Sequence, residues 1–160
     1  MLPLAVLTIV YLVLWLVGSL GARPFRSSVA CLRYALAAMF LLTASAHWGS
    51  RREDLVRMVP PSFQDPGMLV TWTGVAEIVG ALGLLVPRVA PWAASGLALL
   101  LLAMFPANVH AARAGLTIGG EPVTPLLPRA LIQIVFSAAL LVAGFGGTRE
   151  RNRRSKPEPE

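Results

Sequence analysis

Long apolar segments separated by short polar ones make up most of the chain. Five segments approach the roughly 20 apolar residues that a helix needs to cross about 30 Å of hydrocarbon. They cover residues 2–21, 29–48, 68–86, 90–111 and 130–146. The pattern predicts an all-α integral membrane protein, a single transmembrane bundle over residues 1–148.

Composition supports this prediction. Of the 160 residues, 56% are hydrophobic and only 14% are charged. In a soluble domain, about a quarter of all residues are charged. Cys31 is the single cysteine, so the chain forms no internal disulfide. A single cysteine also excludes a Cys-x-x-Cys redox pair and a metal site built from several thiolates.

The basic residues are unevenly distributed. With five spans, nine of the 14 Lys and Arg residues fall on the side of the C-terminus and five on the other. The positive-inside rule then predicts a multi-pass protein of the plasma or inner membrane, with the N-terminus outside and the C-terminus in the cytoplasm. Five of these residues lie in the tail, residues 149–160, which we expect to be disordered. A basic stretch beside a span is typical of a membrane anchor, so we expect no nucleic-acid partner.

The first apolar segment has two interpretations, a cleaved signal peptide or a retained span. It begins without Lys or Arg, and its apolar part is longer than that of a usual signal peptide. Both features favour a retained span.

Two loops on the expected outer side have patterns of their own. Residues 50–67, "SRREDLVRMVPPSFQDPG", alternate charged and apolar positions before Pro60 and Pro61, which predicts a short interfacial helix stopped by the prolines. Residues 114–128, "AGLTIGGEPVTPLLP", have a Gly-Gly pair between β-prone residues, which predicts a small hairpin or lid.

Glu77 lies near the centre of the third span, about 13–14 Å inside it at 1.5 Å per residue. Thr73, Gly74 and Gly80 share its helix face, and bulky apolar residues occupy the opposite face. Small residues permit the close approach of another helix, so Glu77 is expected to face protein. An ionised, unpaired carboxylate at this depth costs at least a few kcal/mol, so Glu77 needs a proton, a cation or water.

Polar residues on the other spans supply candidate partners in the same half of the membrane. Thr43 and His47 share a face at the end of the second span, and Arg129 and Gln133 begin a polar stripe down the fifth. Of Asn108 and His110, only one can face the interior, and Asn108 is preferred because a buried amide needs partners. We predict one polar cluster in which Glu77 meets Arg129 or His47. Its alternatives are a structural pair that sets helix register and, for His47, an interfacial anchor.

Several short motifs, taken in order, resemble the DoxX-like family of small membrane proteins. They are "LRYALAAMFLLTASAHW", "DLVRMVPP", "TGVAEIVGALGLLVPR", "MFPANVHAAR" and "PRALIQIVF", which cover about residues 32–136. The resemblance implies a four-helix transmembrane core to which the first span is extra. Its characteristic polar positions match His47, Glu77, Pro106, Asn108, Arg129 and Gln133. Members of that family are linked to membrane thiosulfate–quinone oxidoreductase, redox-stress complexes and membrane-protein assembly.

Three hypotheses for the function follow. In the first, the protein is a subunit of a membrane oxidoreductase system that binds a quinone-like ligand. Glu77 and His47 would be catalytic and handle protons, while the ligand would contact Arg129, Gln133, Asn108, Thr43 and Thr73; no metal is expected. The second is a non-enzymatic scaffold or assembly factor for another membrane protein. The third is an isomerase or binding protein for a lipid-like substrate. In each case the lipid bilayer is a partner, and a redox subunit or membrane protein is a further one.

Overall fold

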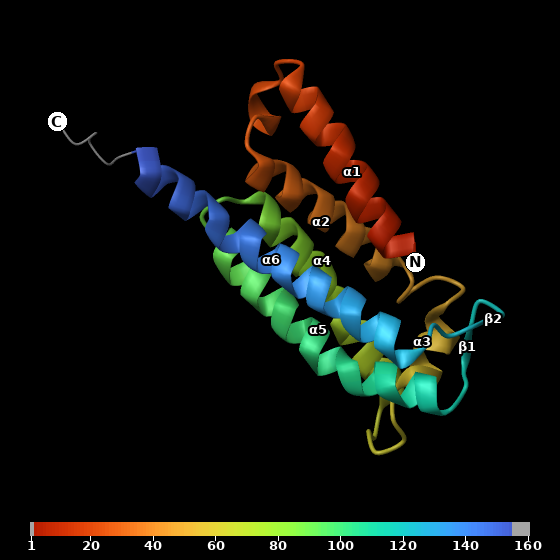
Figure 1. Ribbon diagram of the computed structural model, residues 1–160. Helices are drawn as coiled ribbons and strands as arrows, with labels where there is room; N and C mark the ends of the chain where they lie inside the picture. The colour runs from red at the N-terminus through yellow and green to blue at the C-terminus, as the bar shows by residue number, and fades with distance from the viewer. Residues whose placement is uncertain (1, 155–160) are drawn as a thin grey trace.

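The computed structural model describes the backbone of residues 2–154 and the side chains of residues 2–147. Five long helices dominate it, which confirms the prediction of an all-α bundle (Figure 1). In chain order the elements are α1 (Leu2–Ser19), a short 3₁₀ helix η1 (Arg23–Phe25), α2 (Ser28–Ser45), α3 (Arg52–Met58), α4 (Pro66–Leu85), α5 (Ala90–Arg113), β1 (Thr117–Ile118), β2 (Glu121–Pro122) and α6 (Leu126–Arg154).

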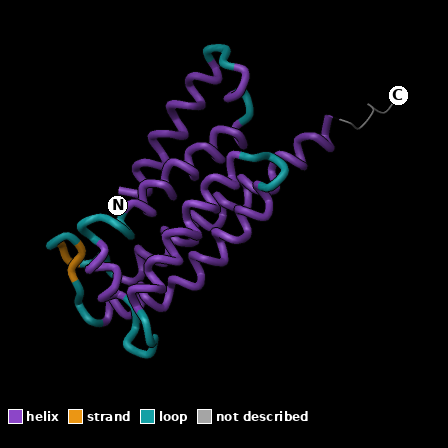
Figure 2. The backbone as a smooth tube through the Cα atoms, turned by 180° about the vertical axis from the view of Figure 1, so that it is seen from behind, coloured by secondary structure: helices purple, strands orange, loops and turns teal. Residues whose placement is uncertain are grey.

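Four of the long helices close into a ring. Helix α2 packs on α4, α4 on α5, α5 on α6, and α6 returns to α2. Helix α1 lies outside this ring and packs on α2 (Figures 1 and 2). The architecture is therefore a four-helix core with an additional N-terminal helix, as the sequence predicted.

Helix α3 and the β1–β2 hairpin lie together at one end of the bundle, close to the N-terminus (Figure 1). Helix α3 ends just before Val59 and Pro60, since proline at that position cannot continue it. The hairpin turn falls on Gly119 and Gly120, with φ of 61° and 83°, values that glycine adopts without steric cost. The predicted short helix before the prolines and the predicted hairpin are thus both present.

The site-bearing helix α4 begins at a clear local signal. The Asp65 carboxylate accepts a hydrogen bond from the backbone N–H of Met68 at 2.9 Å, and Pro66 occupies the first turn. An aspartate cap followed by proline is a favoured helix start. This start fixes where Glu77 falls along the helix.

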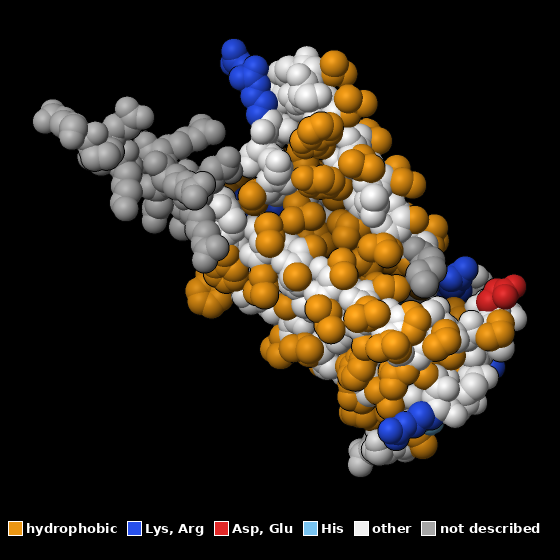
Figure 3. Space-filling view, in the orientation of Figure 1, with side chains coloured by type: hydrophobic (Ala, Val, Ile, Leu, Met, Phe, Trp, Pro, Cys, Tyr) orange, Lys and Arg blue, Asp and Glu red, His pale blue; other side chains and the backbone are white. Residues whose placement is uncertain are grey.

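Side chains divide between a packed interior and an apolar exterior. The largest fully buried ones come from all four ring helices: Phe40, Leu36, Met39, Leu84, Leu97, Leu140 and Cys31. On α4, Gly74, Gly80 and Ala81 are buried, while Trp72, Val79 and Leu82 are more than half exposed, as the sequence predicted. Figure 3 shows hydrophobic side chains over the flank of the bundle and charged ones at its ends. This distribution fits a bilayer around the flank.

All five long helices are long and apolar enough to cross a membrane. The sequence placed the end of the last span near residue 146 and expected disorder from residue 149. That expectation is wrong for residues 149–154, because α6 continues to Arg154. Arg and Glu have high helix propensity, and a helix already formed extends at little cost. The rest of the predicted disordered tail, residues 155–160, lies outside the described residues.

Candidate functional site

Glu77 on α4 pairs with residues at the end of α2. Its Oε2 accepts a hydrogen bond from Thr43 Oγ1 at 2.8 Å, and its Oε1 lies 3.8 Å from His47 Nε2. Both side chains are buried, with exposed fractions of 4% for His47 and 6% for Glu77. Of the two predicted partners for Glu77, the structure therefore selects His47.

The hydrogen bonds of His47 determine which nitrogen carries hydrogen. Nδ1 lies 2.7 Å from the carbonyl oxygen of Val70, and only an N–H can bond to a carbonyl. Nε2 is left to face the carboxylate of Glu77. An ionised Glu77 beside a neutral imidazole would be a buried charge without a counter-charge. A proton on Nε2 makes the imidazole a cation that balances the carboxylate.

Neighbours of His47 also influence its charge. Burial opposes protonation of the imidazole, but the Glu77 carboxylate and the Val70 carbonyl outweigh this effect and raise the pKa of His47. His47 lies two residues beyond the end of α2, at the end of the bundle that carries α3.

Two further residues hold this pair in place. Gly74 allows the close approach of α2, because a Cβ there would lie 2.8 Å from His47 Cβ and from the Trp48 ring. Arg52 donates to the carbonyl oxygen of His47 at 2.7 Å, to that of Gly67 at 3.0 Å and to Thr71 Oγ1 at 2.9 Å. Arg52 thus connects the end of α2 to the first turn of α4.

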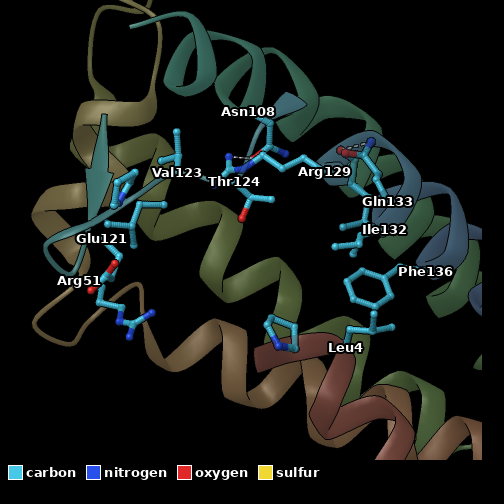
Figure 4. Close-up of a pocket in the computed structure, with 14 residues that line it drawn as sticks. Leu4, Arg51, Asn108, Glu121, Val123, Thr124, Arg129, Ile132, Gln133 and Phe136 are labelled. Atoms are coloured by element: carbon cyan, nitrogen blue, oxygen red, sulfur yellow. Dashed lines mark hydrogen bonds between the residues drawn. The ribbon is translucent and has the colours of Figure 1, made fainter. Parts of the chain in front are cut away.

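A second polar group lies between α5 and α6. Arg129 Nη1 donates to Asn108 Oδ1 at 2.7 Å, and Gln133 Nε2 donates to the carbonyl oxygen of Leu101 at 3.0 Å (Figure 4). The preference for Asn108 over His110 as the inward residue is consistent with this contact. Leu101 belongs to α5, so Gln133 of α6 bonds to the backbone of the neighbouring helix.

The predicted single cluster is therefore two groups. Among the residues with described side chains, no hydrogen bond or ion pair joins Glu77 to Arg129. The structure places Thr73 with the first group, where its Oγ1 donates to the carbonyl oxygen of Val70 at 2.9 Å and lies 3.5 Å from His47 Nδ1. The sequence located these residues in the same half of the bundle, but helix rotation directs them to two different interfaces. Nor do the described residues include a group of three His, Cys, Asp or Glu side chains arranged to hold a metal.

A pocket of about 420 Å³ adjoins the second group only. Its wall comes from α1, α5, α6, the hairpin segment and the residue before α3 (Figure 4): Pro3, Leu4, Leu101, Asn108, Arg129, Ile132, Gln133, Phe136, Ile118, Glu121, Pro122, Val123, Thr124 and Arg51. Thr43, His47, Thr73 and Glu77 do not line it. Of the predicted site residues, Arg129, Asn108 and Gln133 are thus positioned to contact a ligand there.

The hairpin closes one side of this pocket and is tied to α3. Asp54 accepts a hydrogen bond from the backbone N–H of Gly119 at 2.7 Å and pairs with Arg57. The bond from Gly119, followed by Arg57, lowers the pKa of Asp54. The carboxylate therefore stays ionised, and the tether remains intact, at neutral pH.

Sequence reasoning missed several residues of both groups. It used Arg51 and Arg52 only to count charges, and it assigned no role to Leu4 in the first helix. Nothing in the local pattern distinguishes Arg52 from Arg51, because the difference depends on how the start of α3 is placed against the ends of α2 and α4. The two glycines of the hairpin were the one available signal for a lid over a pocket.

Comparison with known proteins gives a family. Residues 36–145 match a family described as a domain of unknown function, DUF8561. No curated protein and no solved structure matches the chain. The matched region contains α4 and α5, α2 from residue 36 onward and α6 up to residue 145. It includes both polar groups and excludes α1. Because the match covers more than half of its length, this chain belongs to the DUF8561 family.

Proposed function

We infer that this protein binds a small amphipathic ligand from the bilayer in the pocket beside Arg129. One observation carries the inference: a half-buried arginine faces a pocket of about 420 Å³ and has no carboxylate partner among the described side chains. Pockets of about 300–1,000 Å³ with a few convergent polar groups are typical of small-molecule sites. The head of the ligand would accept hydrogen bonds from Arg129, with Asn108 and Gln133 orienting it.

The resemblance to the DoxX-like family suggests one class of ligand and one setting. A quinone has carbonyl oxygens that Arg129 could bind and an apolar tail that could lie beside Leu4 and Phe136 of the pocket wall. In that setting the protein would be a binding subunit beside a membrane oxidoreductase, and electrons would reach the quinone from a partner. Its location would be the plasma or inner membrane, with the hairpin end outside and the C-terminus in the cytoplasm.

The two other hypotheses receive less support from the geometry. An isomerase needs an acid–base group at the ligand, and Glu77 and His47 are buried outside the pocket wall. A scaffold would bind its partner through helix faces of small residues, such as that of α4. These residues are used within the chain, because Gly80 packs against Leu97 and Gly74 against His47. We therefore assign the His47–Glu77 pair a structural role that joins α2 to α4.

Native mass spectrometry of the full chain, released from nanodiscs with added decylubiquinone, tests this function. We expect the wild type to retain a bound small molecule, either decylubiquinone or an amphiphile carried through purification. Arg129→Gln should lose it. Arg88→Gln, at an exposed arginine in the loop between α4 and α5, is the matched control and should keep it.

Glu77→Gln separates the two polar groups in the same experiment. Because Glu77 does not line the pocket, this variant should retain the ligand while its thermal stability changes. An apo wild type under all conditions, or equal retention by Arg129→Gln, would overturn the proposed function.

A further inference from the structure

The electrical charge of the pocket wall narrows the class of ligand. Arg129 donates one hydrogen bond, to the neutral amide of Asn108, although a guanidinium has five donors and stays protonated. Within the described part of the chain, no Asp or Glu oxygen lies within ion-pair distance of it. The polar end of the pocket thus contains a half-buried positive charge whose counter-charge is missing.

The other charges at this pocket do not neutralise Arg129. Arg51 and Glu121 are both exposed, on the hairpin side of the wall. The guanidinium of Arg51 lies across the turn, 3.8 Å from where a Cβ on Gly119 would be. With two cations and one carboxylate, the wall has a net positive charge.

The opposite end of the pocket is apolar. Arg129, Ile132, Gln133 and Phe136 follow the three- and four-residue spacing of one helix face. Phe136 lies about 10 Å further along α6 than Arg129, at 1.5 Å per residue. Figure 4 shows Phe136 beside Leu4 at one end of the pocket and Arg129 beside Asn108 at the other. A ligand that fills this space has a polar head and an apolar body.

The apolar end lies between α1 and the ring of four helices. Leu4 comes from α1, which packs on α2, while Phe136 comes from α6. A hydrocarbon tail at this place would run between two helices that each expose apolar side chains on their outer faces. The ligand would then enter the pocket sideways from the lipid phase.

We propose that the Arg129 pocket binds a single-chain amphiphile with a carboxylate head, a long-chain fatty acid or a close analogue, with its tail between α1 and α6. This inference rests on the proposed function and specifies its ligand. A carboxylate accepts two parallel hydrogen bonds from a guanidinium and supplies the missing counter-charge, which a neutral quinone does not. A volume of about 420 Å³ is near the lower limit for small-molecule sites and suits one chain rather than two.

Equilibrium binding to the full chain in phosphatidylcholine nanodiscs, measured by scintillation proximity, tests the proposal. The probes are tritiated palmitate and, as a neutral partner of the same length, tritiated hexadecanol. Competition with unlabelled decylubiquinone and phosphatidylglycerol ranks the other ligand classes. A charge-assisted pair is worth about 1.5–3 kcal/mol, so palmitate should bind about 10-fold to 100-fold more tightly than hexadecanol.

Substitutions at Arg129 test the head group. Arg129→Gln should remove the advantage of palmitate and leave hexadecanol binding unchanged, and Arg129→Lys should restore part of it. Arg88→Gln should behave like the wild type.

A second pair of variants tests the path of the tail without changing charge. Leu4→Trp fills the apolar end and should weaken both probes about 10-fold or more. Ile9→Trp, on the lipid-exposed side of the same helix, should weaken neither. This pair keeps the proposal falsifiable if the Arg129 variants do not fold.

The outcomes separate this proposal from the proposed function. If hexadecanol or decylubiquinone binds as tightly as palmitate and depends on Leu4, the pocket binds ligand but the carboxylate preference is wrong. Tighter binding of phosphatidylglycerol than of palmitate would also overturn it, in favour of a phospholipid head. If no probe binds in a way that depends on Leu4 or Arg129, both proposals fail.

Discussion

Replacing Glu77 by leucine tests the structural role of the buried pair most directly. Leucine keeps the apolar volume of the side chain but removes the acceptor for Thr43 and the partner of His47. The imidazole then keeps its bond to the Val70 carbonyl and has a buried Nε2 with no partner.

The magnitude follows from these two losses. A hydrogen bond to a charged group contributes about 1.5–3 kcal/mol, and a buried polar atom left without a partner costs about 1–3 kcal/mol. The leucine variant no longer pays the desolvation cost of the buried carboxylate, which offsets part of this loss. Removal of one member of a buried pair costs about 3–5 kcal/mol in comparable cases, and we expect about 3 kcal/mol here. At about 2–4 °C per kcal/mol for a chain of this size, the melting temperature should fall by about 6–12 °C.

Differential scanning fluorimetry of the purified protein in detergent measures this shift. The exposed Glu53→Gln on α3 is the control and should stay within about 0.5 kcal/mol of the wild type. A double variant, His47→Leu with Glu77→Leu, should be more stable than Glu77→Leu alone, because no polar partner is then left behind. A melting temperature for Glu77→Leu within 1–2 °C of the wild type, or a double variant that loses the sum of both effects, would refute the reasoning.

The pH dependence provides a second readout of the same variant. Because the pKa of His47 is raised in the folded protein, its contribution to stability is complete below its ordinary value, near 6.5, and disappears as the pH rises through the raised value. The difference in melting temperature between wild type and Glu77→Leu should therefore narrow from pH 6 to pH 9. A difference that stays constant or widens would show that Glu77 does not raise the pKa of His47.

Two further predictions concern packing and the hairpin. Gly80→Ala places a Cβ 2.5 Å from Leu97 and should lower the free energy of unfolding by about 1–3 kcal/mol. Gly96→Ala has open space around it and should leave stability unchanged or raise it by up to about 1 kcal/mol. Thermal melting compares the two variants. Asp54→Ala removes the acceptor for the Gly119 N–H, so amide hydrogen exchange of residues 117–122 should accelerate at neutral pH. In the wild type, exchange measured relative to the intrinsic rate at each pH should accelerate in the same way only as the pH falls through the lowered pKa of Asp54. Unchanged exchange in Asp54→Ala would show that other contacts hold the hairpin.

The sequence alone determined which segments are helices and which faces of them are apolar. Each span depends on a local requirement: a backbone in hydrocarbon must satisfy its own hydrogen bonds, and about 20 apolar residues in a row do so as a helix. Local signals such as Asp65 followed by Pro66 fixed the start of α4, and the glycine face of that helix showed that Glu77 points inward. The prediction of disorder in the tail was wrong up to Arg154, because charge and proline content say little about how far a helix propagates.

Only the tertiary structure decided which polar groups meet. The sequence offered Glu77 both His47 and Arg129, and either pairing satisfies the same carboxylate. The choice depends on which helices are neighbours and how each is rotated, and both follow from packing over the whole bundle. Packing of α4 on α2 brings Glu77 to His47, and packing of α5 on α6 brings Arg129 to Asn108. Leu4 of α1 completes the pocket wall. Contacts between segments far apart in the chain leave no periodic trace in any one of them, which is why the sequence predicted the residues of the site but not its division into two.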